Sequence, residues 1–118
     1  MKKVVIYISG PYRGPSTWAI ENNIRRAEAL ALEVWKAPGF YAICPHSNTR
    51  FFQDTLPDTV WLDGSLEIMK RCDAVLLTKD WIVSAGARTE RLVALDSGIP
   101  VFENLGELKE HFLYREPK

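Results

Sequence analysis

Four short apolar runs, separated by stretches with helical periodicity, constrain the fold of this chain more than any other feature. The first run, Lys3–Ser9, is continuous and rich in β-branched residues, which is typical of a strand buried on both faces. The other runs are Phe40–Cys44, Asp73–Thr78 and Ile99–Phe102. Strands that alternate with helices form right-handed crossovers and a parallel sheet covered on both sides. The pattern therefore predicts an α/β fold.

Helix start and stop signals fill the intervals between these runs. Ser16 or Thr17 can cap the first helix, Pro38-Gly39 stops it, and Asp58 can cap the next. A chain of 118 residues has room for one core and not for two, so residues 1–118 are predicted to form a single domain. We expect a Rossmann-like or flavodoxin-like three-layer sandwich with a four- to five-stranded parallel sheet. The predicted helices run from Ser16 or Thr17 toward Pro38-Gly39, and over residues 58–71, 85–97 and 105–112.

Charge and composition narrow the classes of partner. Fifteen Lys and Arg residues balance fifteen Asp and Glu residues, which gives no electrostatic case for duplex nucleic acid or an anionic membrane. The apolar run at the start is too short for a signal peptide, and no segment approaches the ~18 apolar residues of a membrane span. Cys44 and Cys72 fit neither a disulfide framework nor a zinc site. We expect buried, reduced thiols in a cytoplasmic protein without a metal or cofactor.

The predicted sheet locates a candidate site. In such sheets, ligands bind beyond the carboxyl ends of the strands. The loops at those ends are Ser9–Pro15, Pro45–Thr55, Lys79–Gly86 and Glu103–Leu105. This arrangement predicts one crevice, lined by Tyr7, Arg13, His46, Trp81, Ser84 and Glu90.

The segment Ser84–Glu90 carries the strongest candidate for chemistry. Ser84 can cap the helix that follows, Gly86 lets a ligand approach the backbone, and the helix dipole favours an anion there. Glu90 lies on a helix face of small and apolar residues, where an ionised carboxylate costs free energy. Tyr7 is placed to donate its hydroxyl to Glu90. In the alternative interpretation Glu90 is solvated and Tyr7 is a core residue bonded to a backbone carbonyl.

Three other residues of the crevice have two interpretations each. Arg13 lies in a loop without the lysine of a Walker loop or the third glycine of a dinucleotide fingerprint, which excludes an ATPase or a dehydrogenase. Its guanidinium can clamp a phosphate, or it is an ordinary surface arginine. His46 can donate to a ribose, a base or a phosphate, or it can orient its own loop. Trp81 can stack on a base, or it can belong to the core or to a subunit interface.

Three motifs distributed over residues 4–102 resemble one known family. They are Tyr7-Ile-Ser-Gly-Pro-Tyr12, Cys72-Asp-Ala-Val-Leu-Leu77 and Trp81-x-x-Ser84-x-Gly86-Ala87-x-x-Glu90-x-x-x-Ala94. Together they resemble the nucleoside 2-deoxyribosyltransferase superfamily, especially its small prokaryotic and phage-type members. That superfamily includes N-glycosidases that act on nucleoside 5′-monophosphates. The resemblance implies that Glu90 is the nucleophile that attacks the anomeric carbon and that Tyr7 orients its carboxylate.

The sequence departs from the family pattern at two positions. The family commonly carries an aspartate eight residues before the aspartate of the Cys-Asp pair, and that position is Ser65 here. Asp63 lies two residues earlier, so either a bend at Gly64 brings it in as the acid or the acid is lost. Ser84 stands where monophosphate hydrolases tend to carry serine and where transferases of free nucleosides tend to carry aspartate. The departure at Ser84 favours a 5′-phosphate substrate.

We therefore expect an N-glycosidase that hydrolyses a (deoxy)nucleoside 5′-monophosphate, with Glu90, Tyr7 and Asp63 as catalytic residues. The alternatives are a deoxyribosyltransferase that exchanges bases and a nucleotide-binding module without chemistry. The resemblance also implies a homo-oligomer, a dimer or larger, with a nucleoside or nucleotide as its small-molecule partner. The predicted substrate-binding residues are Ser9, Gly10, Arg13, His46, Ser65, Trp81, Ser84 and Gly86.

Overall fold

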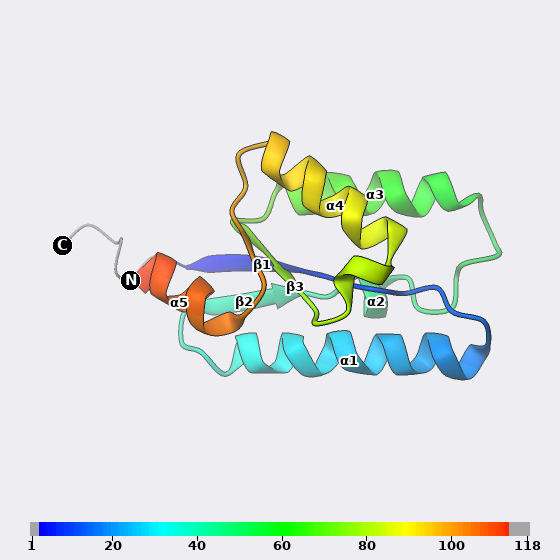
Figure 1. Cartoon of the computed structure of the whole chain (residues 1–118), viewed down its shortest axis with the longest axis horizontal. Coiled ribbons are helices and arrows are strands. Elements are labelled where there is room, and N and C mark those ends of the chain that lie inside the picture. The colour runs from blue at the N-terminus through cyan, green and yellow to red at the C-terminus, as the bar shows by residue number, and fades with distance from the viewer. Residues whose placement is uncertain (1–2, 114–118) are drawn as a thin grey trace.

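A computed structural model describes residues 3–113 as a parallel sheet between helices (Figure 1). The strands are β1 (Val4–Ser9), β2 (Phe40–Ile43), β3 (Ala74–Leu77) and β4 (Val101–Phe102). Their order in the sheet is β2-β1-β3-β4, and every neighbouring pair is parallel. This order follows the flavodoxin-like arrangement, in which the direction of winding reverses between β1 and β3. The predicted α/β class and parallel sheet are confirmed, with four strands.

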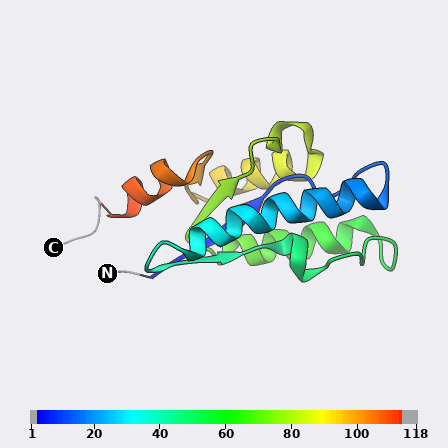
Figure 2. The same ribbon diagram turned by 90° about the horizontal axis from the view of Figure 1, so that it is seen from below.

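Helices cover both faces of the sheet. In Figure 1, α3 and α4 lie above the sheet and α1 lies below it, and in Figure 2 α1 is the layer nearest the viewer. The helix α5 packs on the α1 face, where its Leu108 is fully buried. A three-residue 3₁₀ turn, η1 (Trp81–Val83), precedes α4. The helices are α1 (Thr17–Trp35), α2 (Pro45–Asn48), α3 (Asp58–Lys70), α4 (Ala85–Asp96) and α5 (Leu105–Leu113).

Most of the predicted helix boundaries follow the expected capping chemistry. The Ser16 side chain accepts a hydrogen bond from the first turn of α1, and Gly98, which follows α4, has a φ of +76°, a conformation that glycine adopts without steric cost. The prediction for Asp58 is wrong. Pro57 occupies the cap position of α3 without a side-chain hydrogen bond, and Asp58 is the first helical residue. Its carboxylate binds Arg13 instead.

Alternation along β1 divides the core into two clusters. Val4, Ile6 and Ile8 face α1, while Tyr7 faces α3 and α4. These four side chains are at most 2% exposed, and burial of each aliphatic one contributes about 1.5–3 kcal/mol. The period of two puts Ser9 on the same face as Tyr7. Polar groups of β1 are therefore directed toward α3 and α4.

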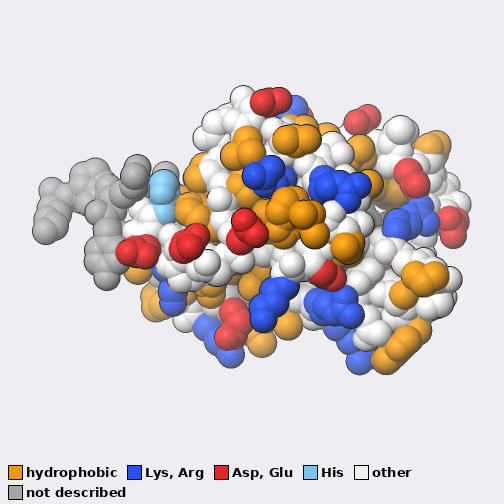
Figure 3. All heavy atoms as spheres, viewed as in Figure 1, with side chains coloured by type: hydrophobic (Ala, Val, Ile, Leu, Met, Phe, Trp, Pro, Cys, Tyr) orange, Lys and Arg blue, Asp and Glu red, His pale blue; other side chains and the backbone are white. Residues whose placement is uncertain are grey.

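The surface carries charges of both signs. On the face seen in Figure 3, lysine and arginine side chains lie among aspartate, glutamate and apolar side chains. Within residues 3–113, no helix is both long enough and apolar enough to cross a membrane. The segments that follow β1 and β2 run to the same end of the molecule (Figure 1). That end holds two of the loops predicted to form the crevice, Ser9–Pro15 and Pro45–Thr55.

Candidate active site

Glu90 of α4 is buried against the end of β1. The residue is 8% exposed, and both of its carboxylate oxygens accept hydrogen bonds from β1 hydroxyl groups. The Tyr7 hydroxyl donates to Oε2, and the Ser9 hydroxyl donates to Oε1 at 2.7 Å. The carboxylate thus lies at the carboxyl end of β1, beside β3, where the winding of the sheet reverses and where ligands bind in folds of this kind.

Small residues on α4 allow the helix to pack close enough to the sheet for Glu90 to reach β1. The Ser84 hydroxyl accepts from the backbone N–H of Ala87 at 3.1 Å and caps the helix, as predicted. Ala87 and Ala94 are at most 1% exposed and share a helix face with Glu90. Because alanine extends little beyond the backbone, α4 packs close to the sheet, and the longer Glu90 side chain reaches β1. Gly86 is exposed in the first turn.

Burial and hydrogen bonding act in opposite directions on the carboxylate. Burial raises the pKa of Glu90 above its ordinary value, because the charged form loses hydration, while the hydrogen bonds from Tyr7 and Ser9 favour that form. Burial, together with the nearby Glu90 charge, raises the pKa of Tyr7 well above its ordinary value. Tyr7 therefore keeps its proton and remains a hydrogen-bond donor. The carboxylate is held in one orientation by two neutral donors.

Ser65 joins this group, and Asp63 does not. The Ser65 side chain interacts with Tyr7 and lowers the pKa of the tyrosine. Asp63 is exposed on the same helix. Two helical positions correspond to about 200° of rotation, so the side chain at 63 faces away when the one at 65 faces β1. Gly64 lies within a continuous helix, and the bend that would bring Asp63 toward Glu90 is not seen.

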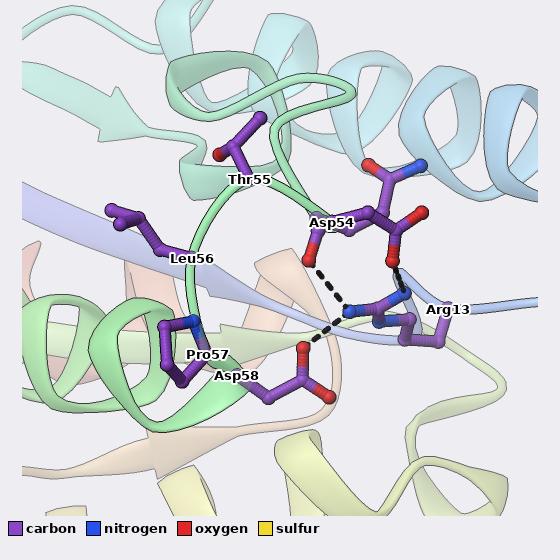
Figure 4. Close-up of a pocket in the computed structure, with 7 residues that line it drawn as sticks. Arg13, Asp54, Thr55, Leu56, Pro57 and Asp58 are labelled. Carbon is purple, nitrogen blue, oxygen red and sulfur yellow. Dashed lines mark hydrogen bonds and ion pairs between the residues drawn. The ribbon is translucent and has the colours of Figure 1, made fainter.

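Arg13 lies at an exposed corner of the molecule and binds carboxylates of the protein itself. Its guanidinium pairs with Asp58 and, at 3.6 Å, with Asp54, and it donates to the carbonyl oxygen of Gln53 at 3.1 Å (Figure 4). The Arg13 side chain is 49% exposed, and the two aspartates are 75% and 89% exposed. Arg13, which the sequence suggested as a ligand for phosphate, is therefore paired with two exposed aspartates.

An open pocket of about 750 Å³ lies at this corner, lined by Arg13 and residues 53–58. In Figure 4 the guanidinium is directed toward the loop that carries Asp54 and toward the start of α3. Tyr7, Ser9 and Glu90 are not among the residues that line this pocket. The residues expected to line one crevice thus lie in two places. Glu90 is a buried carboxylate, and Arg13 lines an exposed pocket with acidic residues.

His46 and Gly10 are engaged by the protein's own structure. His46 is 5% exposed, and its Nε2 lies 3.1 Å from the carbonyl oxygen of Gly10 and 2.9 Å from that of Pro11. Gly10 is packed so tightly that a Cβ there would collide with the side chain of Thr78. Of the two interpretations of His46, the contacts agree with the one in which it orients a loop.

Trp81 lies just beyond β3 and is partly buried. Its indole Nε1 donates to Glu103 at 3.2 Å, and the guanidinium of Arg91 lies 5.2 Å from its ring. The same side chain packs against the cluster between the sheet and α4. Trp81 therefore links the loops that follow β3 and β4, and Arg91 covers part of its ring.

Tyr12 joins the loops that follow β1 and β2 through contacts that were not predicted from the sequence. The Tyr12 hydroxyl donates to Gln53 at 2.9 Å and accepts from the backbone N–H of Phe51 at 2.6 Å. Phe51 has a φ of +60°, which is uncommon for a residue other than glycine. The position of Tyr12 in the Gly-Pro-Tyr loop was the available signal, but its partners lie about forty residues away.

No group of three or more His, Cys, Asp and Glu side chains within residues 3–113 is arranged to hold a metal ion. Cys44 and Cys72 are free and only partly buried.

Residues 4–103 match the model of one protein family, whose description is a domain of unknown function (DUF4406). No curated protein matches the chain. The family match covers β1 to β4 and includes the residues that surround Glu90.

Proposed function

The chain belongs to the DUF4406 family, and for this member we propose an N-glycosidase that hydrolyses a (deoxy)nucleoside 5′-monophosphate with Glu90 as the nucleophile. The observation that carries this proposal is the buried carboxylate of Glu90, bonded through both oxygens to the hydroxyls of Tyr7 and Ser9. A structural protein gains little from an ionisable group in such a place, because burial of a charge costs free energy. An oriented, partly desolvated carboxylate is what the anomeric carbon of a nucleoside requires.

The proposed reaction has two steps. One carboxylate oxygen of Glu90 forms a bond to C1′ of the sugar as the bond from C1′ to the base nitrogen breaks. The base leaves with the bonding electrons and takes up a proton. Water then attacks C1′ as the bond to Glu90 breaks. Its hydroxyl remains on the sugar, its other proton passes to solvent and balances the proton taken up by the base, and Glu90 is released as a carboxylate. The net products are the free base and the sugar 5-phosphate.

The hydroxyl groups around Glu90 have distinct parts in this proposal. Tyr7 keeps its hydrogen bond to one oxygen while the other attacks, so that the lone pair remains directed at the substrate. Ser9 stabilises the carboxylate again when the covalent intermediate is hydrolysed. The sequence left open whether Asp63 or another group protonates the leaving base, and the exposed position of Asp63 favours uptake of that proton from solvent.

The 5′-phosphate is proposed to bind at Arg13 and at the N-terminus of α4, which Ser84 caps. At Arg13, a phosphate would replace Asp58 and Asp54 as the partner of the guanidinium. Exposed ion pairs contribute only about 0–1 kcal/mol, so this exchange costs little. A phosphate monoester can accept two parallel hydrogen bonds from one guanidinium and carries a higher charge than a carboxylate.

The proposal is tested by incubating the purified protein with a panel of ribo- and deoxyribonucleoside monophosphates and separating the products. We expect free base and sugar phosphate from wild type and none above background from Glu90→Ala. A 2-fluoro substrate, which slows both steps, is expected to leave a sugar phosphate covalently attached to Glu90. Base release that depends on an added acceptor base and prefers unphosphorylated substrates indicates a deoxyribosyltransferase instead. If wild type and Glu90→Ala release equal amounts, the nucleophile is wrong.

A second candidate function is a nucleotide-binding module without chemistry. The exposure of Asp63 favours it, because no carboxyl group besides Glu90 adjoins Tyr7 and Ser9 among the contacts of the described residues. In that case Glu90 would accept a hydrogen bond from a sugar hydroxyl. Saturable binding by calorimetry, with neither turnover nor a covalent adduct, would select this function.

A further inference from the structure

His46 is a buried histidine that makes no contact with Glu90. It lies in α2, directly after β2, and is 5% exposed. Its Nε2 is within hydrogen-bond distance of two backbone carbonyl oxygens, those of Gly10 and Pro11. A carbonyl oxygen can only accept, so Nε2 carries the proton and donates it to the loop that follows β1. That donor is therefore not free for a substrate.

The other ring nitrogen of His46 has no partner. Its Nδ1 is buried without a hydrogen bond to any residue that the structure describes. A doubly protonated ring would place a second N–H there, with nothing to accept it. Burial lowers the pKa of His46, although the carbonyls of Pro11 and Gly10 and the charges of Asp80 and Glu28 act in the opposite direction. His46 is thus a neutral ring with a single defined tautomer.

The loop that His46 holds is fixed from a second side by the end of β3. The backbone N–H of Thr78 donates to the carbonyl of Ser9 at 2.9 Å, and the Thr78 side chain occupies the space that a Cβ on Gly10 would need. His46 contacts the carbonyl on the far side of the same glycine. The peptide that follows Ser9 is therefore held between residues that follow β2 and β3.

We propose that His46 is a positioning residue, which fixes the loop after β1 and thereby keeps the Ser9 hydroxyl on the Glu90 carboxylate. The route is short, because the carbonyl that His46 binds belongs to the residue next to Ser9. Release of that carbonyl frees the backbone torsions of Gly10, the residue that follows Ser9, and leaves only the Thr78 hydrogen bond to hold the end of β1 on that side. The serine hydroxyl then loses its fixed direction, and one oxygen of Glu90 loses its donor.

Two substitutions separate positioning from other roles. In His46→Gln the side-chain amide can place an N–H where Nε2 stands, whereas in His46→Asn the shorter chain cannot reach it. Where base release is measured, we expect His46→Asn to lower kcat about tenfold with little change in KM, by misorienting the nucleophile. His46→Gln should recover most of the loss, and substitution of the other histidine, His111→Asn on α5, should change neither value. A rise in KM with unchanged kcat in both His46 variants would instead make His46 a substrate ligand and overturn the proposal.

The kinetic readout rests on the proposed function, so a second readout needs no turnover. The titration of Glu90, followed by carbon-13 NMR of its carboxyl group, reports the Ser9 hydrogen bond, because that bond lowers the pKa of Glu90. We expect a higher pKa in Ser9→Ala and in His46→Asn, and a wild-type pKa in His46→Gln. Urea unfolding shows that each variant is folded at the titration temperature. A wild-type Glu90 pKa in folded His46→Asn overturns the proposal, whereas the expected shift without any base release contradicts only the glycosidase.

Discussion

The two ends of the expected crevice hold their charges in opposite ways. Glu90 is 8% exposed and receives neutral hydroxyl donors on both oxygens. Arg13 is 49% exposed and pairs with two aspartates that are more exposed still. The first arrangement is rigid and costly, because a charge has been taken out of water. The second is solvated, and its partners exchange readily.

In the proposed function, this difference separates chemistry from recognition. A nucleophile benefits from a fixed direction and from incomplete solvation, and the buried end of the molecule provides both. A residue that must release one anion to take another benefits from weak, exposed partners, and the Arg13 corner provides those. Substitutions at the buried end should therefore change kcat, and substitutions at the exposed end should change KM.

The largest expected effect is that of Glu90→Gln. The amide keeps the shape of the side chain but cannot form the glycosyl bond, so we expect base release to fall by about 10³-fold or more. The matched control is Glu110→Gln, at an exposed position of α5, which should leave kcat unchanged. Product formation is followed by chromatography under saturating substrate. A fall of less than about tenfold would mean that the buried carboxylate stabilises charge and does not form the covalent bond.

Tyr7→Phe should have the next largest effect and should show it as a change in pH dependence. The Tyr7 hydrogen bond lowers the pKa of Glu90, so its loss raises that pKa. Because the nucleophile must be ionised, the acid limb of the kcat profile should move to higher pH, and kcat on the plateau should fall by about 10–100-fold. Tyr12→Phe, which removes a hydroxyl from the exposed loop, should leave the acid limb where it is. An unmoved limb in Tyr7→Phe would show that Glu90 ionisation does not control the rate.

Substitutions at the exposed end should act on KM. Arg13→Gln removes a charged ligand of the phosphate and should raise KM for monophosphates about tenfold, with kcat nearly constant. Asp58→Asn removes the competing carboxylate and should lower KM a few-fold. Free nucleosides, which lack the phosphate, should respond to neither substitution. If Arg13→Gln leaves KM unchanged, the phosphate binds elsewhere, and the Arg13 corner is only a link between two loops.

The sequence predicted the architecture well because the signals for it are local. The continuous apolar run of β1 and the Ser16 cap are read from neighbouring residues, and both appear in the structure. Boundaries were less accurate where tertiary hydrogen bonds decide them. The last strand begins at Val101 and not at Ile99, because the Ile99 N–H bonds to the Ala94 carbonyl and closes the end of α4.

In the candidate site, too, contacts set by local periodicity were predicted and contacts between distant loops were not. The pairing of Tyr7 with Glu90 was predicted, since the period of a strand and the period of a helix place both on facing surfaces. The contact between Arg13 and Asp58 was not, because an exposed ion pair between distant loops has no sequence periodicity. Of the two alternatives for Asp63, the bend at Gly64 is not seen, since an exposed glycine within a packed helix can keep helical torsions at a cost of about 1 kcal/mol.

The smallest expected effect concerns stability, and it tests the contrast between the two ends without any substrate. Burial raises the pKa of Glu90 above its ordinary value of 4.5, so the folded protein binds a proton more tightly there than the unfolded chain does. The corresponding stability is complete below pH 4.5 and is lost as the pH rises through the folded-state value. Glu90→Gln has no such proton to lose. The free energy of unfolding of Glu90→Gln, relative to wild type, should therefore increase with pH above 4.5 and then level off.

Asp58→Asn should behave differently, because its carboxylate is solvated in both states. We expect its free energy of unfolding to stay within about 1 kcal/mol of wild type at every pH, with a difference that shrinks in high salt. Urea unfolding from pH 4 to pH 8 measures both variants under the same conditions. Parallel pH curves for wild type and Glu90→Gln would mean that the carboxylate titrates as a solvated group. The buried end would then resemble the exposed one, and the free energy held in an oriented, desolvated nucleophile would not exist.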